Sequence, residues 1–525
     1  MQKLVTKNVF SSVFFNVINL VVRLFLPPLI LAFVSLEEYG IWTICFTLIT
    51  YLNLGAIGIT NVYVRYVAEY HSKNEIDKIS GLLSTGMVLV TTISFIMLLI
   101  FWFLLEVLVQ TIFRISPELH STASVLFFGT AIILVFQVSI GSAFVRMLNG
   151  LQQIADTMLV FIVGLLLETL LSVVMLFSGF GIYALLYAMA IRTLFTSLAY
   201  IVMSFKAVPN LSISFKNFDR AYFKVFYRFG AVVQLAGLIG TFLNTLDKLL
   251  TSSFLSMQAT ALLGLGSRFP AMAVTVPASI SAVFLPATSY MHSQQRQSEM
   301  IEMYITGSRT IGLLTGSILG FLAAFSVPII IAWLGTNPKY QVAATVMTIY
   351  TLSQHFHVLT GPGSSFFRGI DKPANNLIYS FNRLFFTGLC VFIGFKIFGI
   401  SIISISLSIA IATTISAVIY LSSNNYRIGV PQLTFLTKVI LPGLVPYGIA
   451  YLLYWSTSPW LTIIMSNRWH TAILVITEGV IYSILMIGVI YWIIYTKEEQ
   501  THSRDLSLKV IKKIIKSFSK QTNPK

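Results

Sequence analysis

Long apolar runs separated by short polar breaks dominate the chain from residue 9 to residue 495. A helix that crosses a bilayer needs about 20 mostly apolar residues, and fourteen runs reach that length. The longest break, at about 206–221, is too short to hold a soluble domain. We therefore predict an all-α polytopic membrane protein with about fourteen transmembrane helices, at 9–34, 39–66, 80–108, 119–146, 155–179, 181–205, 222–253, 258–290, 303–333, 340–367, 374–397, 399–422, 435–456 and 470–495.

The composition supports this interpretation. Of the 525 residues 56% are hydrophobic and only 10% are charged, whereas soluble proteins carry about 25% charged residues, which argues against a soluble enzyme. The net charge of +16 would suit a nucleic-acid binder, but the basic residues lie in the short breaks, which indicates a membrane surface and no nucleic acid. Cys45 and Cys390 lie inside apolar runs and predict neither a disulfide nor a zinc site.

The distribution of basic residues orients the helices. Most of the 34 Lys and Arg residues fall in the breaks on the side of the N-terminus or in the C-terminal tail, whereas the breaks on the other side hold only Arg114, Lys339, Lys396 and Arg468. Because positive charge concentrates on the cytoplasmic side, we place both termini in the cytoplasm. In the tail, 507–518 has lysines on one helical face and apolar residues on the other, so it is either an amphipathic helix on the inner leaflet or a solvated basic tail.

An internal repeat divides the chain. Asn16, Asn19 and Arg23 have the same spacing as Thr241, Asn244 and Lys248, and 149–156 resembles 368–375 at nearly the same offset. The spacing places each triad on one helical face. Repeats of this kind are typical of transporters whose substrate path lies between two halves. We predict an N-terminal six-helix lobe at 1–205, a basic linker at 206–221, a second lobe at 222–424, an added helix pair at 425–495 and a basic tail at 496–525.

Charges inside the spans are the main functional signal. Six cations lie there: Arg23, Arg192, Lys248, Arg268, Arg309 and Arg383. Six cations facing lipid would cost about 15–20 kcal/mol, which exceeds the stability of a typical fold, about 5–15 kcal/mol. Only Glu168, Asp247 and Glu478 are clearly intramembrane acids. We therefore predict a cationic cavity that receives an anion.

Some of these groups also have structural interpretations. Arg192 would brace a neighbouring helix, and Glu478 would hydrogen-bond between helices. His355 and His357 fit packed histidines better than a proton relay. Arg268 lies between small residues and Pro270, which favours a functional bend.

No catalytic pattern is present. The sequence has no Gly-rich phosphate loop with a following Lys-Ser/Thr, so it predicts neither ATP hydrolysis nor a cofactor. No paired acids lie in an external loop, as a membrane glycosyltransferase or glycan polymerase would require. We expect a transporter driven by an ion gradient, the membrane potential or the concentration difference of its substrate.

The sequence resembles the polysaccharide-exporter branch of the multidrug/oligosaccharidyl-lipid/polysaccharide (MOP) superfamily, which includes the Wzx-type O-antigen flippases. The stretches that carry the resemblance are Leu36–Trp42, Leu52–Gly55, Arg65–Tyr70, the region from Asp247–Leu250 through Arg268 to Pro286, and the repeated Asn149-Gly150 and Arg368-Gly369. The resemblance implies two six-helix lobes arranged as a V around a cavity, as in MATE transporters. It also implies movement of a polyisoprenoid-diphosphate-linked oligosaccharide, such as an O-antigen unit of lipopolysaccharide, across a bacterial inner membrane.

The resemblance also assigns roles. In related lipid II flippases, cations on the first and eighth helices surround the diphosphate, and the positions corresponding by helix are Arg23 and Arg268. The added helices at 435–456 and 470–495 correspond to a groove for the lipid tail. A monomer surrounded by membrane lipids is expected, and contact with the polysaccharide polymerase machinery is left open.

Our hypothesis is a flippase that works by alternating access. Arg23, Lys248, Arg268 and Arg383 would bind the diphosphate, and the sugar hydroxyls would be bound by Asn16, Asn19, Gln234, Thr241 and Asn244. Coupling to H⁺ or Na⁺ is left open. A MATE-type drug or cation antiporter with Glu168 or Asp247 as its ion site is one alternative, and a membrane glycan polymerase or glycosyltransferase is another.

Overall fold

A computed structural model describes residues 18–494 except 282 and 373, with backbone alone at 52–61, 223–225, 227–237, 461–463 and 493–494. The described chain is helical and contains no strand. After a first helix at Ile18–Ile30, it forms α2 (Leu36–Ser72), α3 (Ile76–Glu106), α4 (His120–Phe136), α5 (Ser142–Gly150), α6 (Ile154–Phe177), α7 (Tyr183–Ala207), α8 (Ala221–Phe254), α9 (Met257–Ala273), α10 (Thr275–Ser281), α11 (Phe284–Ser293), α12 (Gln297–Ala324), α13 (Ser326–Leu334), α14 (Gln341–Gly369), α15 (Asn375–Phe398), α16 (Ile402–Ile428), α17 (Gln432–Phe435), α18 (Leu441–Ile464) and α19 (Arg468–Val489).

The helices confirm the predicted fold class of a multi-pass α-helical membrane protein. Nine helices of the described chain are long and apolar enough to cross a membrane, or ten if one broken pair counts as a single span. Only helices and closed barrels satisfy their backbone groups in lipid, which explains why the apolar runs form helices. The count of fourteen and the cytoplasmic termini stay predictions, and the proposed tail helix at 507–518 lies outside the described residues.

Two predicted spans are interrupted. The run 258–290 forms α9, α10 and α11, and α9 ends at Ala273, three residues after Pro270. The run 303–333 breaks between α12 and α13 near Pro328. A proline removes a backbone donor and its ring clashes with the preceding turn, so both interruptions follow from the local sequence.

The chain forms two compact units, which are described separately. Unit 1 consists of Met1–Arg268 and Ala374–Ser416, and unit 2 of Phe269–Pro373 and Ala417–Lys525. The three boundaries fall within α9, between α14 and α15, and within α16. The predicted division into lobes and linkers stays a prediction.

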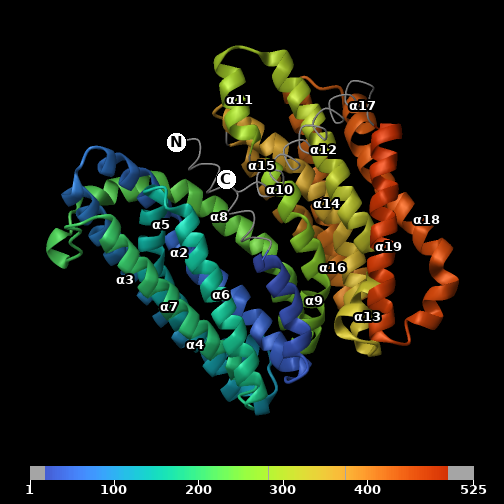
Figure 1. Ribbon diagram of the computed structural model, residues 1–525, viewed down its shortest axis with the longest axis horizontal. Helices are drawn as coiled ribbons and strands as arrows, with labels where there is room; N and C mark the ends of the chain where they lie inside the picture. The colour runs from blue at the N-terminus through green and yellow to red at the C-terminus, as the bar shows by residue number, and fades with distance from the viewer. Residues whose placement is uncertain (1–17, 282, 373, 495–525) are drawn as a thin grey trace, which may run out of the picture. The chain divides into compact units, whose positions relative to one another are not determined.

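In unit 1, α2 packs against α8, α3, α4 and α5, and α6 lies along α7 (Figure 1). The segment between α7 and α8 is attached to α3 by hydroxyl groups. The backbone N–H of Ser212 donates to Ser80 Oγ (3.1 Å) and that of Asp219 to Thr85 Oγ1 (3.0 Å). These two N–H groups lie outside any helix, and the hydroxyls on α3 supply the acceptors that they need. The linker therefore packs along the start of α3.

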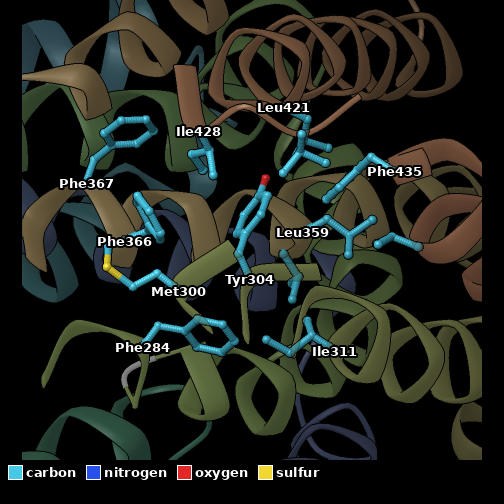
Figure 2. Packing of buried hydrophobic residues seen from close by; sticks show 13 residues of the cluster. Phe284, Met300, Tyr304, Ile311, Leu359, Phe366, Phe367, Leu421, Ile428 and Phe435 are labelled. Atoms are coloured by element: carbon cyan, nitrogen blue, oxygen red, sulfur yellow. The ribbon is translucent and has the colours of Figure 1, made fainter. Parts of the chain in front are cut away.

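In unit 2, an aromatic cluster fills the space between α12, α14, α16 and α17. Tyr304 lies at its centre, with Phe366 and Phe435 beside it (Figure 2). The Tyr304 hydroxyl donates to Asn425 Oδ1 at 2.9 Å, so the one polar atom of this buried ring is satisfied. Nearby, α12 and α18 approach so closely that a Cβ at Gly316 would overlap the Gly443 carbonyl oxygen.

Candidate functional site

Three arginines and one glutamate of unit 1 form an electrostatic cluster, referred to below as the arginine cluster: Arg23, Arg192, Arg268 and Glu168. The guanidinium of Arg23 lies within electrostatic range of the other three, of which Arg192 and Glu168 contact each other directly. It lies on the first helix, where its Nε donates to Asn19 Oδ1 at 3.0 Å. The cluster therefore joins side chains from the first helix, α6, α7 and α9 within one compact unit.

Arg192 and Glu168 form an ion pair inside the cluster. Arg192 Nη1 lies 2.6 Å from Glu168 Oε2, and the two side chains are only 15% and 17% exposed. The guanidinium also lies 4.9 Å from the ring centroid of Phe161 on α6. Gly164 lets α6 and α7 approach, because a Cβ there would overlap Thr196 on α7. Arg192 therefore makes an ion pair with Glu168 and a cation–π contact with Phe161.

Arg268 is held in a different way. Its Nη1 donates to the hydroxyl of Tyr39 at 2.9 Å, so this hydrogen bond has a neutral acceptor. Tyr39 is buried in the first turn of α2. A capping box between Ser35 and Glu38 fixes the start of that helix.

The next residue, Gly40, brings α2 and α9 together. A Cβ at Gly40 would overlap the carbonyl oxygen of Met257, the first residue of α9. The stretch Leu36–Trp42, which carried part of the family resemblance, therefore joins the helix of Tyr39 to the helix of Arg268. This local geometry explains why the two side chains meet although they are far apart in sequence.

The polar residues of α8 make contacts of their own. Arg383 on α15 is buried, and its Nη1 donates to Asn244 Oδ1 at 2.9 Å. Tyr51 on α2 shares a hydrogen bond of 2.6 Å with Thr245. Asp247 is buried, and one of its carboxylate oxygens accepts from the backbone N–H of Lys248 at 2.8 Å. These contacts join α8 to α2 and α15.

The structure brings some predicted residues together and separates others. Arg23 and Arg268 share the arginine cluster, with Asn19 beside Arg23. Arg383 and Asn244 instead contact each other. Thr241 and Lys248 are both partly buried on α8. Asn16 and the side chain of Gln234 lie outside the described residues.

Sequence reasoning did not assign Arg192, Tyr39 or Tyr51 to the site. Arg192 and Glu168 are opposite charges on consecutive spans, a signal that could have paired them. Tyr39 lies in a stretch that carries the family resemblance, but nothing in the sequence links it to Arg268.

Two other expectations concern a buried histidine and metal binding. His355 is completely buried against Gly316 and Gly443, which fits a packed histidine. Among the described residues, no three His, Cys, Asp or Glu side chains gather as metal ligands would.

The arginine cluster carries an excess of positive charge. Three guanidinium groups against one carboxylate leave an excess of two positive charges. Guanidinium groups bind phosphate oxygens through paired N–H donors. Arg192 and Arg268 are partly buried, which strengthens such contacts because their charges are less screened than in water.

Comparison with known proteins gives a family and a fold. The family model described as polysaccharide biosynthesis protein matches residues 5–292. The structure of the lipid II flippase MurJ in an inward closed conformation aligns with a TM-score of 0.69 and 17% identity, over 92% of this chain and 98% of that one. No match is found among curated proteins.

Two further structures share the fold. An inward-facing MATE family transporter of the MOP superfamily aligns with a TM-score of 0.63 and 16% identity, over 78% of this chain and 98% of that one. A MOP superfamily transporter from Pyrococcus furiosus aligns with a TM-score of 0.53 and 16% identity, over 81% of this chain and 93% of that one. The resemblance drawn from the sequence is therefore confirmed at the level of family and fold.

Proposed function

Because the chain belongs to the polysaccharide biosynthesis protein family, we propose that it is a flippase for a polyisoprenoid-diphosphate-linked oligosaccharide. It moves this lipid from the inner to the outer leaflet of a bacterial cytoplasmic membrane by alternating access, as a step in making a surface polysaccharide such as O-antigen. The observation that carries the proposal is the arginine cluster, whose excess of two positive charges lies in a protein with the fold of membrane transporters.

The cluster suits a diphosphate for two reasons. A diphosphate diester carries about two negative charges at neutral pH, which equals the excess of the cluster. Arg23 and Arg268 donate to neutral acceptors, Asn19 and Tyr39, so these hydrogen bonds do not neutralise their charges. The name of the similar MurJ structure, a lipid II flippase, describes a protein that moves a lipid-linked sugar.

The membrane potential supplies a driving force for such an anion. An inside-negative potential favours outward movement by about 2.3 kcal/mol per charge and 100 mV. Transport therefore requires no separate ion site. Glu168, one of the two acids considered for ion coupling, is already paired with Arg192.

The test replaces the two cluster arginines that bind neutral partners. In cells that depend on this chain for export, the Arg23→Gln and Arg268→Gln double variant should abolish surface glycan and leave the lipid-linked glycan on the inner leaflet. The matched control is Arg296→Gln, which removes an exposed arginine paired with Glu299. Surface glycan at the control level, from a double variant present in the membrane in normal amount, would show that the proposed site is wrong.

A further inference from the structure

The carboxylate of Glu168 is the unexpected member of the arginine cluster. A phosphate ligand and a carboxylate repel each other, so a site built only for tight binding would omit the acid. Glu168 is nevertheless paired with Arg192 at 2.6 Å and is largely buried. Its carboxylate also lies within electrostatic range of Arg23. The role of this acid rests on the proposed function and concerns the charge of the same site.

The packing of α6 and α7 keeps this acid in place. Gly164 lies one helical turn before Glu168 on α6 and leaves room for the side chain of Thr196. Thr196 lies one turn after Arg192 on α7. The Phe161 ring supports the guanidinium from α6. Glu168 therefore neutralises Arg192 as part of the fold, and the charge left for a ligand comes from Arg23 and Arg268.

We infer that Glu168 is a specificity-determining residue that sets the net charge of the site to match a diphosphate. Three arginines alone would bind a doubly charged headgroup too tightly, and a transporter that binds its substrate too tightly releases it slowly. With Glu168 present, the bound complex is electrically neutral. A lipid with a single phosphate leaves part of the positive charge uncompensated and binds less well.

The inference predicts opposite effects from the two members of the ion pair. Glu168→Gln raises the charge of the site by one and should tighten binding of a polyisoprenyl diphosphate by roughly tenfold, equal to about 1.4 kcal/mol. Arg192→Gln lowers the charge by one and should weaken binding by a similar factor. The double variant restores the original charge and should bind like the parent protein.

The measurement uses the full chain in nanodiscs. The ionic strength is kept at the physiological value, because salt screens exposed charges and would change the measured affinities. The probes are polyisoprenyl diphosphate and polyisoprenyl monophosphate, and both affinity and transport rate are measured. Glu168→Gln should transport the diphosphate lipid more slowly while binding it more tightly. The control is Glu299→Gln, the same chemical change in the exposed pair with Arg296, which should change neither quantity.

A purely structural ion pair gives a different result. Both single variants would then weaken binding, and the double variant would not recover it, which overturns the inference. If Glu168→Gln alone fails to fold, the double variant still decides, because it keeps the original net charge without the ion pair and should bind like the parent only if net charge sets the affinity. If Arg23→Gln with Arg268→Gln leaves diphosphate affinity unchanged, the proposed function fails instead.

Discussion

The contact between α2 and α9 makes Gly40 a sensitive position. Adding one methyl group in Gly40→Ala would place a Cβ inside the van der Waals radius of the Met257 carbonyl oxygen. Both partners belong to helix backbones, so no side-chain rotation relieves the overlap. The two helices must move apart, and Arg268 on α9 then moves away from Tyr39 on α2.

The expected cost follows from two opposing terms. Overpacking in a well-packed interior costs about 1–3 kcal/mol, and an overlap between backbones belongs at the upper end. Alanine recovers about 0.5–1 kcal/mol, because glycine is the poorer helix former. A net loss of about 2 kcal/mol remains, which corresponds to a roughly 30-fold larger population of the opened state.

Cys45 provides a local probe, because it is completely buried in α2 five residues after Gly40. In a Cys390→Ser background, only Cys45 reacts with a thiol-specific dye. When opening is fast, the labelling rate follows the population of the opened state, so Gly40→Ala should accelerate labelling about 30-fold.

The control is Gly388→Ala on α15, where an added Cβ would meet nothing within 4 Å. It should leave labelling unchanged or slow it. If Cys45 is labelled at the same rate in Gly40→Ala as in the parent, α2 and α9 do not approach as described, and the placement of Arg268 loses its support.

Three further substitutions test single contacts. Tyr39→Phe removes the acceptor of Arg268, and since hydrogen bonds to charged groups contribute about 1.5–3 kcal/mol, diphosphate affinity should fall about tenfold or more; an unchanged affinity would contradict the contact. Arg468→Gln removes donors to two carbonyl oxygens at the end of α13, at 3.0 and 2.7 Å, and hydrogen exchange in that turn should accelerate, whereas unchanged protection would argue against it. Gly316→Ala should lower the free energy of unfolding by about 1–3 kcal/mol because the added Cβ would overlap the Gly443 carbonyl oxygen on α18, and a melting temperature equal to that of the parent would refute the close approach.

The sequence alone was sufficient for the class of fold and for identifying candidate charged residues. Lipid offers no hydrogen bonds, so an apolar run of sufficient length has to form a helix. The same environment makes an intramembrane arginine too costly to face lipid. The positions of Arg23 and Arg268 within apolar runs therefore suffice to mark both as functional candidates.

The partners of each charge depended on tertiary structure. Arg383 reaches Asn244, Arg268 reaches Tyr39, and Arg192 joins Glu168 within the range of Arg23. Each of these contacts depends on which helix faces meet and how closely they approach.

Those approaches are set by single small residues such as Gly40 and Gly164, whose effect depends on the atoms across the interface. A hydrophobic run shows that a helix exists but carries no record of the neighbour it will pack against. The charges could be counted from the sequence, whereas their pairing, and with it the charge left for a substrate, arises only when the helices pack.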